Sequence, residues 1–182
     1  DFLMCFNLNN TLFEPSILSV TDIGEKKYIV KVGFFNNKNK NYYLNCIYNI
    51  IADLNENEIK FSNVRSYNMK KFDSCDFDEV SFYYERNSNF DKDESVRFTK
   101  INKKISQFFN LEKLAFKYVK CKNFYDCKKL VGYDFDLNMF DNNQIGAFSY
   151  PSYKVIFSGN NSLINTHELV HLYTYEKFKN TN

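Results

Sequence analysis

The chain has little of what marks several specialised classes of protein. It contains no Trp, only two His, and five Cys without a paired C-x-x-C arrangement. This Cys pattern fits neither a zinc ribbon nor a dense disulfide scaffold. No apolar run approaches the length of a membrane-spanning helix, so we expect no membrane span. The net charge is +2, with acidic and basic residues interspersed, which argues against a nucleic-acid partner.

What remains is the composition of an ordinary globular protein. The 182 residues are 44% hydrophobic and 25% charged, enough to bury a core in one domain or in two small ones. There is no internal repeat and no low-complexity linker. Because the chain begins at Asp1, we expect it to be processed or cut from a longer protein. Secretion or a place in the cell envelope after loss of a signal peptide fits this, but the compartment stays open.

The first part of the chain shows the period of β-strands. Apolar residues alternate over residues 28–35 and 42–52, and a third apolar run covers residues 59–64. Polar turns separate these runs, which predicts an antiparallel meander. The residues before about Ser19 indicate little beyond a turn at Pro15-Ser16. We therefore expect a β-rich N-terminal region over residues 1–72.

The second part alternates strands and helices. Strands are expected at residues 79–85 and 114–119, and a helix between them over residues 91–110. Asn123 can cap a short helix that ends at Gly132. Two short extended arms follow over residues 145–158, on either side of Pro151. The fold class is α+β, with a mixed sheet and helices in a second region over residues 73–182.

The chemistry of the chain is concentrated in the stretch from Thr166 to Tyr173. His167 and His171 lie four residues apart, so on a helix both imidazoles can reach one metal ion. Two neutral imidazoles suit Zn²⁺, and Glu168 beside the first His can take a proton from a water that the metal activates. Both His of the chain fall in this motif. The simpler alternative is an amphipathic helix with two ordinary histidines.

The helix itself is indicated independently of the motif. Ser162 is a candidate N-cap after a turn at residues 159–161. A stripe at spacings of three and four follows, which we expect to be buried and to carry both imidazoles. It consists of Ile164, His167, His171, Tyr175 and Phe178.

Residues from about 78 onward resemble the N-terminal half of a zincin metallopeptidase catalytic domain. The likeness is to the gluzincin branch, the thermolysin-like and aminopeptidase-like group also termed peptidase MA. It rests on the order of elements and on His167-Glu168-Leu169-Val170-His171. The resemblance implies a zinc-dependent peptidase with Glu168 as general base and a peptide or protein substrate. It also implies that Ala147 and Phe148, on an edge strand, offer main-chain groups to that substrate.

The sequence departs from this family at the third zinc ligand. A gluzincin takes that ligand from a Glu on a later helix, which these residues do not include. A metzincin needs Gly and His where Thr174 and Lys177 stand, so that branch is excluded. Glu176 is the only carboxylate after the motif, and we interpret it as a solvated surface residue. We expect residues 1–182 alone to bind zinc weakly and to hydrolyse peptides little.

Two other functions stay open. A deformylase-like amide hydrolase also carries His-Glu-x-x-His late in a short chain and uses an upstream Cys as third ligand. Cys127 lies at a suitable distance, although its surroundings lack the Gly-Cys-x-Ser setting of that family. The other alternative is an inactive pseudo-peptidase or a β-rich binding module that keeps the His pair without turnover.

Two of the five Cys lie close together in the sequence. Cys121 lies at the end of a predicted strand, and Cys127 lies on a predicted helix. This spacing is compatible with a disulfide and with two buried free thiols.

Overall fold

The computed structural model describes residues 13–38, 41–55, 58–137, 139 and 144–180. Its residues form two compact units. Unit 1 is drawn from residues 1–70 and 128–140, and unit 2 from residues 71–127 and 141–182. The chain therefore first passes between units close to the boundary expected after residue 72. Residues 128–140, which the sequence analysis assigned to the second region, belong to unit 1 instead.

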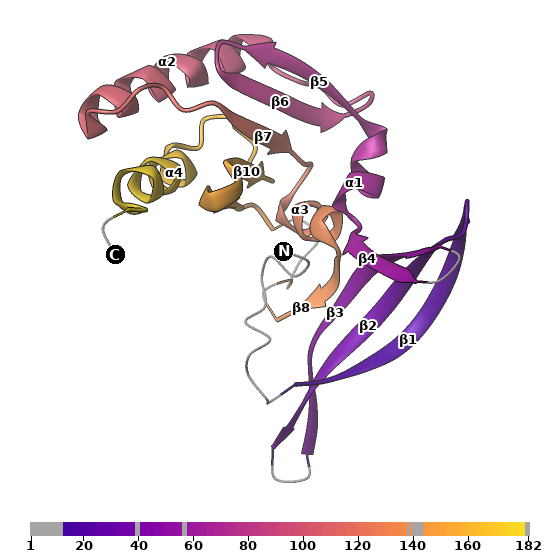
Figure 1. Cartoon of the computed structure of the whole chain (residues 1–182). Helices are drawn as coiled ribbons and strands as arrows, with labels where there is room; N and C mark the ends of the chain where they lie inside the picture. Colours follow the sequence, from indigo (N-terminus) through magenta and orange to yellow (C-terminus); the bar gives the residue numbers. More distant parts are fainter. Residues whose placement is uncertain (1–12, 39–40, 56–57, 138, 140–143, 181–182) are drawn as a thin grey trace. The chain divides into compact units, whose positions relative to one another are not determined.

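Unit 1 is an antiparallel sheet in the order β1-β2-β3-β4, with β8 also paired to β3 (Figure 1). Strands β2, β3 and β4 match the three apolar runs expected over residues 28–35, 42–52 and 59–64. Short helical turns, α1 (Arg65–Asn68) and η1 (Met69–Lys71), follow β4. The strands are β1 (Phe13–Gly24), β2 (Lys27–Lys38), β3 (Asn41–Leu54), β4 (Ile59–Asn63) and β8 (Tyr133–Asp136).

Two strands of unit 1 were not expected. β1 contains Pro15, for which the sequence predicted a turn, and Pro15 instead pairs opposite Phe34. Proline is tolerated there because β1 is an edge strand. β8 lies between the helix expected to end at Gly132 and the extended arms expected from residue 145, where no strand was expected. It pairs with β3 opposite Tyr48, whose hydroxyl donates a 2.7 Å hydrogen bond to the Val131 carbonyl.

Unit 2 contains a mixed sheet in the order β5-β6-β7-β10-β9. β6 (Val80–Glu85), β7 (Phe116–Lys120) and β10 (Val155–Ser158) run parallel, and the two edge strands are antiparallel to their neighbours. The edges are β5 (Phe72–Phe77), where the sequence analysis expected no strand, and β9 (Ala147–Tyr150). The turn η2 (Pro151–Tyr153) joins β9 to β10 and confirms the expected pair of extended arms.

Helices α2 (Lys92–Phe109) and α4 (Thr166–Phe178) complete the core of unit 2. α2 runs as expected, from a cap at Asp91 to a left-handed Asn110. Phe98 of α2 and Leu169 of α4 share one buried cluster with Phe82 and Ile156 of the sheet, so both helices contribute to one core. α3 (Phe124–Val131) begins after the Asn123 cap, as expected. No described helix has the length and apolarity needed to cross a membrane.

The described cysteines are free thiols, which decides between the two alternatives for Cys121 and Cys127. Cys46, Cys121 and Cys127 are buried, and Cys75 is half-buried. Burial, and to a smaller degree the charge of Asp136, raises the pKa of Cys46 to about 12. Cys5 lies outside the described residues.

We predict that iodoacetamide at pH 8 alkylates Cys75 faster than Cys46, Cys121 or Cys127 in the folded protein, because the thiolate is the reactive form and burial blocks access. Peptide mass analysis would measure this. Rapid alkylation of Cys46 at pH 8 would contradict its burial.

The stability of unit 1 should also depend on pH. Because burial raises the pKa of the Cys46 thiol from 9.0 to about 12 in the folded protein, the free energy of unfolding should fall as the pH rises through that window.

Candidate metal centre

The helix that carries the motif begins three residues later than the sequence suggested. α4 starts at Thr166, and the side chain of Asn165 caps it by accepting a hydrogen bond from the Glu168 N–H. Ser162 is not the cap. Its hydroxyl bonds instead to the Glu94 carboxylate at the start of α2, which also accepts from the Leu163 N–H at 2.8 Å. The pattern Asn165-x-x-Glu168 is itself a helix-start signal that the sequence contained.

The buried face of α4 differs from the predicted one. Leu169, Leu172 and Tyr173 are buried, whereas both His are exposed. Of the stripe expected to be buried, Ile164, Tyr175 and Phe178 are also exposed. Apolar residues occur all round α4, so spacing alone did not distinguish the face that packs from the face that does not.

Tyr173 fixes α4 to its neighbours through a buried polar network. Its hydroxyl donates to Asn102 Oδ1 at 2.6 Å and accepts from the Leu114 N–H at 3.0 Å. Asn102 in turn donates from its side-chain amide to the Leu114 carbonyl at 3.1 Å. Each polar group in this network has a partner, which makes its burial tolerable and sets the rotation of α4 about its own axis.

That rotation turns the two imidazoles outward and toward each other. The Nε2 atoms of His167 and His171 lie 3.0 Å apart, so the predicted common reach is confirmed although the predicted burial is wrong. Two nitrogens bound to one tetrahedral zinc at ordinary bond lengths lie about 3.3 Å apart. The donor pair therefore fits a zinc ion with a small adjustment. The same contact can also be a hydrogen bond between two neutral rings with complementary tautomers.

Glu168 lies beside this pair but on the buried side of the helix surface. Its side chain is 10% exposed, against 76% for His167, and its Oε1 lies 3.9 Å from His167 Nε2. Its Oε2 accepts a 2.8 Å hydrogen bond from the Ser149 hydroxyl on β9. The carboxylate also lies in the first turn of α4, where the helix dipole favours a negative charge.

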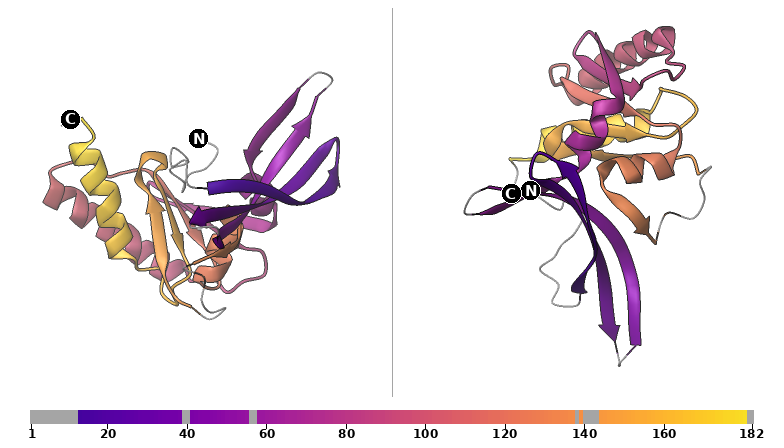
Figure 2. Two further views of the ribbon diagram at one scale, coloured as in Figure 1. Left: turned by 90° about the horizontal axis from the view of Figure 1, so that it is seen from below. Right: turned by 90° about the vertical axis from the view of Figure 1, so that its right-hand side faces the viewer.

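The strand β9 runs beside α4 in unit 2 (Figure 2). As expected, it lies at the sheet margin, because it pairs with β10 and with no other described strand. Ser149 was not singled out in the sequence as a site residue. Its place two residues after Ala147, on the same face of the strand, is the signal that could have identified it.

The register of β9 separates the two residues expected to meet a substrate. The Gly159 N–H bonds to the Gly146 carbonyl at 2.8 Å, and hydrogen-bonded pairs alternate along an antiparallel ladder. Phe148 is therefore in a hydrogen-bonded pair with Phe157, and its main-chain groups point to β10. The main-chain groups that point away from the sheet belong to Ala147 and Ser149.

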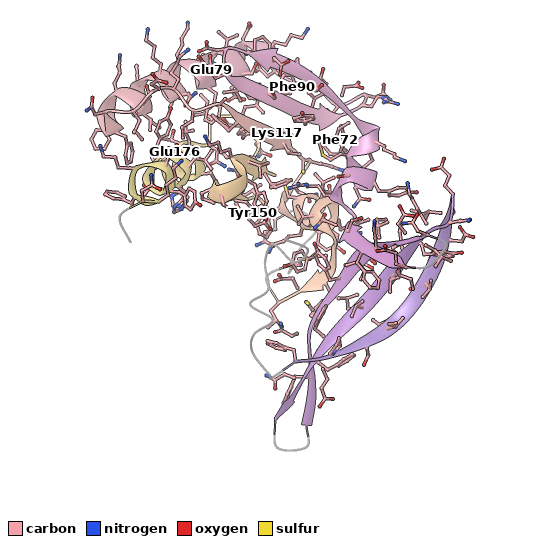
Figure 3. All side chains as sticks on the ribbon, viewed as in Figure 1. Phe72, Glu79, Phe90, Lys117, Tyr150 and Glu176 are labelled. Atoms are coloured by element: carbon pink, nitrogen blue, oxygen red, sulfur yellow. The ribbon has the colours of Figure 1, made fainter. Side chains whose placement is uncertain are left out.

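Within the described part of the chain, His167, Glu168 and His171 form the only group of three potential metal ligands. Cys127 is fully buried and is not in it. Glu176, further along α4 (Figure 3), bonds to Lys179 at 2.8 Å and lies 3.8 Å from Lys154. The hydrogen bond from Lys179 lowers the pKa of the Glu176 carboxyl. Glu176 is thus a partly exposed, ion-paired residue.

Comparison of the chain with protein-family models, with curated proteins and with solved structures finds no match. The candidate site is therefore supported by its own geometry.

The face assignment of α4 can be tested by two truncations. Leu172→Ala should lower the free energy of unfolding by about 2–5 kcal/mol, since it opens a cavity at a 1% exposed position. Val170→Ala, at a 37% exposed position, should cost less than about 1 kcal/mol. Urea unfolding followed by circular dichroism measures both. Equal costs would mean that the buried face of α4 is wrongly assigned.

Proposed function

We propose that this chain is part of a zinc-dependent peptidase in which His167 and His171 hold the metal and Glu168 is the general base. The observation that carries the proposal is the distance of 3.0 Å between the two Nε2 atoms, with a nearly buried carboxylate beside them. Exposed imidazoles on a helix surface leave room for a metal and a substrate to approach. The resemblance of the sequence to gluzincins is consistent with this proposal.

The roles of the residues follow from their surroundings. Zinc bound by the two imidazoles would lower the pKa of a water molecule and polarise a peptide carbonyl. Glu168 would accept a proton from that water on Oε1, since Oε2 already accepts a hydrogen bond from the Ser149 hydroxyl. It would then pass the proton to the leaving amine. An extended peptide could bond to the outward main-chain groups of β9 at the sheet edge.

Catalytic zinc sites usually have three protein ligands. The described residues supply two imidazoles, and Glu176 is engaged by Lys179 and Lys154. By the resemblance, the third ligand is a Glu on a helix outside these residues. No observation favours the deformylase-like alternative, because Cys127 is not in the ligand group. The tests of metal binding and turnover below distinguish the proposed peptidase from an inactive pseudo-peptidase or binding module.

Metal binding is the first test. Residues 1–182 should bind about one Zn²⁺ or Co²⁺ weakly, as measured by equilibrium dialysis and by the visible spectrum of Co²⁺. His167→Ala or His171→Ala should weaken binding by about a hundredfold or more, because each removes a ligand. Both side chains are exposed, so neither change should alter the fold. An affinity for Zn²⁺ that neither substitution changes would contradict the metal site.

Turnover is the second test, and it requires the full-length protein that contains this chain. There, Glu168→Gln should keep the metal and lower the rate of peptide hydrolysis by about 10²–10⁴-fold, since Gln cannot accept the proton. Glu176→Gln, a matched change on the same helix, should leave both unchanged. Zinc binding without hydrolysis by the unaltered protein would favour the pseudo-peptidase. Full activity of Glu168→Gln would exclude Glu168 as general base.

A further inference from the structure

Ser149 makes a side-chain hydrogen bond to the Glu168 carboxylate. It lies in the middle of β9, and its hydroxyl donates to Glu168 Oε2 at 2.8 Å. The neighbouring Phe148 contributes to an aromatic cluster with Phe124 and Phe157. The alternation of a strand places the side chain of Phe148 on the face of the sheet opposite to that of Ser149. The packing of Phe148 therefore helps to hold Ser149 in place toward α4.

The hydrogen bond makes the two oxygens of Glu168 unequal. Oε2 is occupied by the hydroxyl, and Oε1 is left 3.9 Å from His167 Nε2, on the side of the imidazole pair. A Glu side chain has three rotatable bonds, so without this contact the carboxylate could turn away from the pair. A general base loses efficiency when its position changes by as little as about 1 Å.

The main chain of Ser149 also belongs to an edge strand of the described sheet. The register of β9 directs the N–H and C=O groups of Ala147 and Ser149 away from β10. One residue thus offers main-chain groups to an extended chain and a side chain to the carboxylate. A peptide paired along β9 would order this strand, and the Ser149 hydroxyl on it holds the Glu168 carboxylate by a hydrogen bond.

We propose that Ser149 is a positioning residue that links the pairing of an extended peptide along β9 to the orientation of Glu168. This inference rests on the proposed peptidase function. Ser149 keeps its own proton throughout, and the proton removed from water goes to Glu168 Oε1. Removing the hydroxyl leaves the main-chain groups of β9 in place, so substrate binding and the chemical step should respond differently.

The kinetic test compares Ser149→Ala, Ser149→Thr and Ser152→Ala in the full-length, zinc-loaded protein. Ser149→Ala should lower kcat by about tenfold to a hundredfold with KM changed by less than about twofold. Ser149→Thr keeps the donor and should restore most of kcat. Ser152 is exposed in the turn after β9, so Ser152→Ala should behave as the unaltered protein. Zinc affinity should be the same in all four proteins.

A second readout does not depend on activity. In metal-free protein, nuclear magnetic resonance should show a Ser149 hydroxyl proton that exchanges slowly with water, and a nuclear Overhauser effect between this proton and the Glu168 side chain. Both signals should be absent in Ser149→Ala and present in Ser149→Thr, which keeps a hydroxyl at this position. Their absence in the unaltered protein would overturn the inference.

The outcomes also separate the inference from the proposed function. If the unaltered protein hydrolyses peptides and Ser149→Ala has the same kcat, the positioning role is wrong and the peptidase assignment stands. If KM rises while kcat is unchanged, Ser149 acts on substrate binding and the inference is again wrong. If the unaltered, zinc-loaded protein hydrolyses no peptide, both the proposed function and the inference fail.

Discussion

Leu169, Leu172 and Tyr173 hold α4 against the core of unit 2, and the geometry of the candidate metal centre follows from that contact. The two Leu side chains share a buried cluster with residues of α2 and the mixed sheet. The Tyr173 hydroxyl adds hydrogen bonds to Asn102 and Leu114 that an apolar contact cannot supply. Burial is favourable at almost any rotation of an apolar helix, but the polar network is satisfied at one rotation only. That rotation turns both imidazoles away from the core.

The same arrangement gives the three polar residues of the motif different environments. The two proposed metal ligands, His167 and His171, are exposed, which leaves one side open to a metal and a substrate. The proposed base, Glu168, is nearly buried between the first turn of α4 and the Ser149 hydroxyl, which fixes its position. Its neighbour in sequence, His167, points to solvent because adjacent residues on a helix face directions about 100° apart. One turn of helix can therefore supply both kinds of environment at the border between core and solvent.

Much of the fold was accessible from local pattern, and the failures have physical causes. Strands β2, β3 and β6 and helix α2 were predicted because alternation and capping are local signals. Strands β1, β5 and β8 were missed because their sequences are weakly apolar and their stability comes from pairing with a neighbour. Pairing partners can be far apart in sequence, as β8 and β3 are, and no local window contains both.

The sequence by itself determined which residues could form the site. Its only two His stand four apart with Glu168 between them, and helical geometry brings residues at that spacing together wherever the helix packs. The tertiary structure decided which face of α4 is buried, which described strand lies at the edge of the sheet beside α4, and that Ser149 contacts Glu168, nineteen residues later in the sequence. These depend on the register of β9 and on the packing of α4. Both are set by contacts between distant segments, on which local periodicity carries no information.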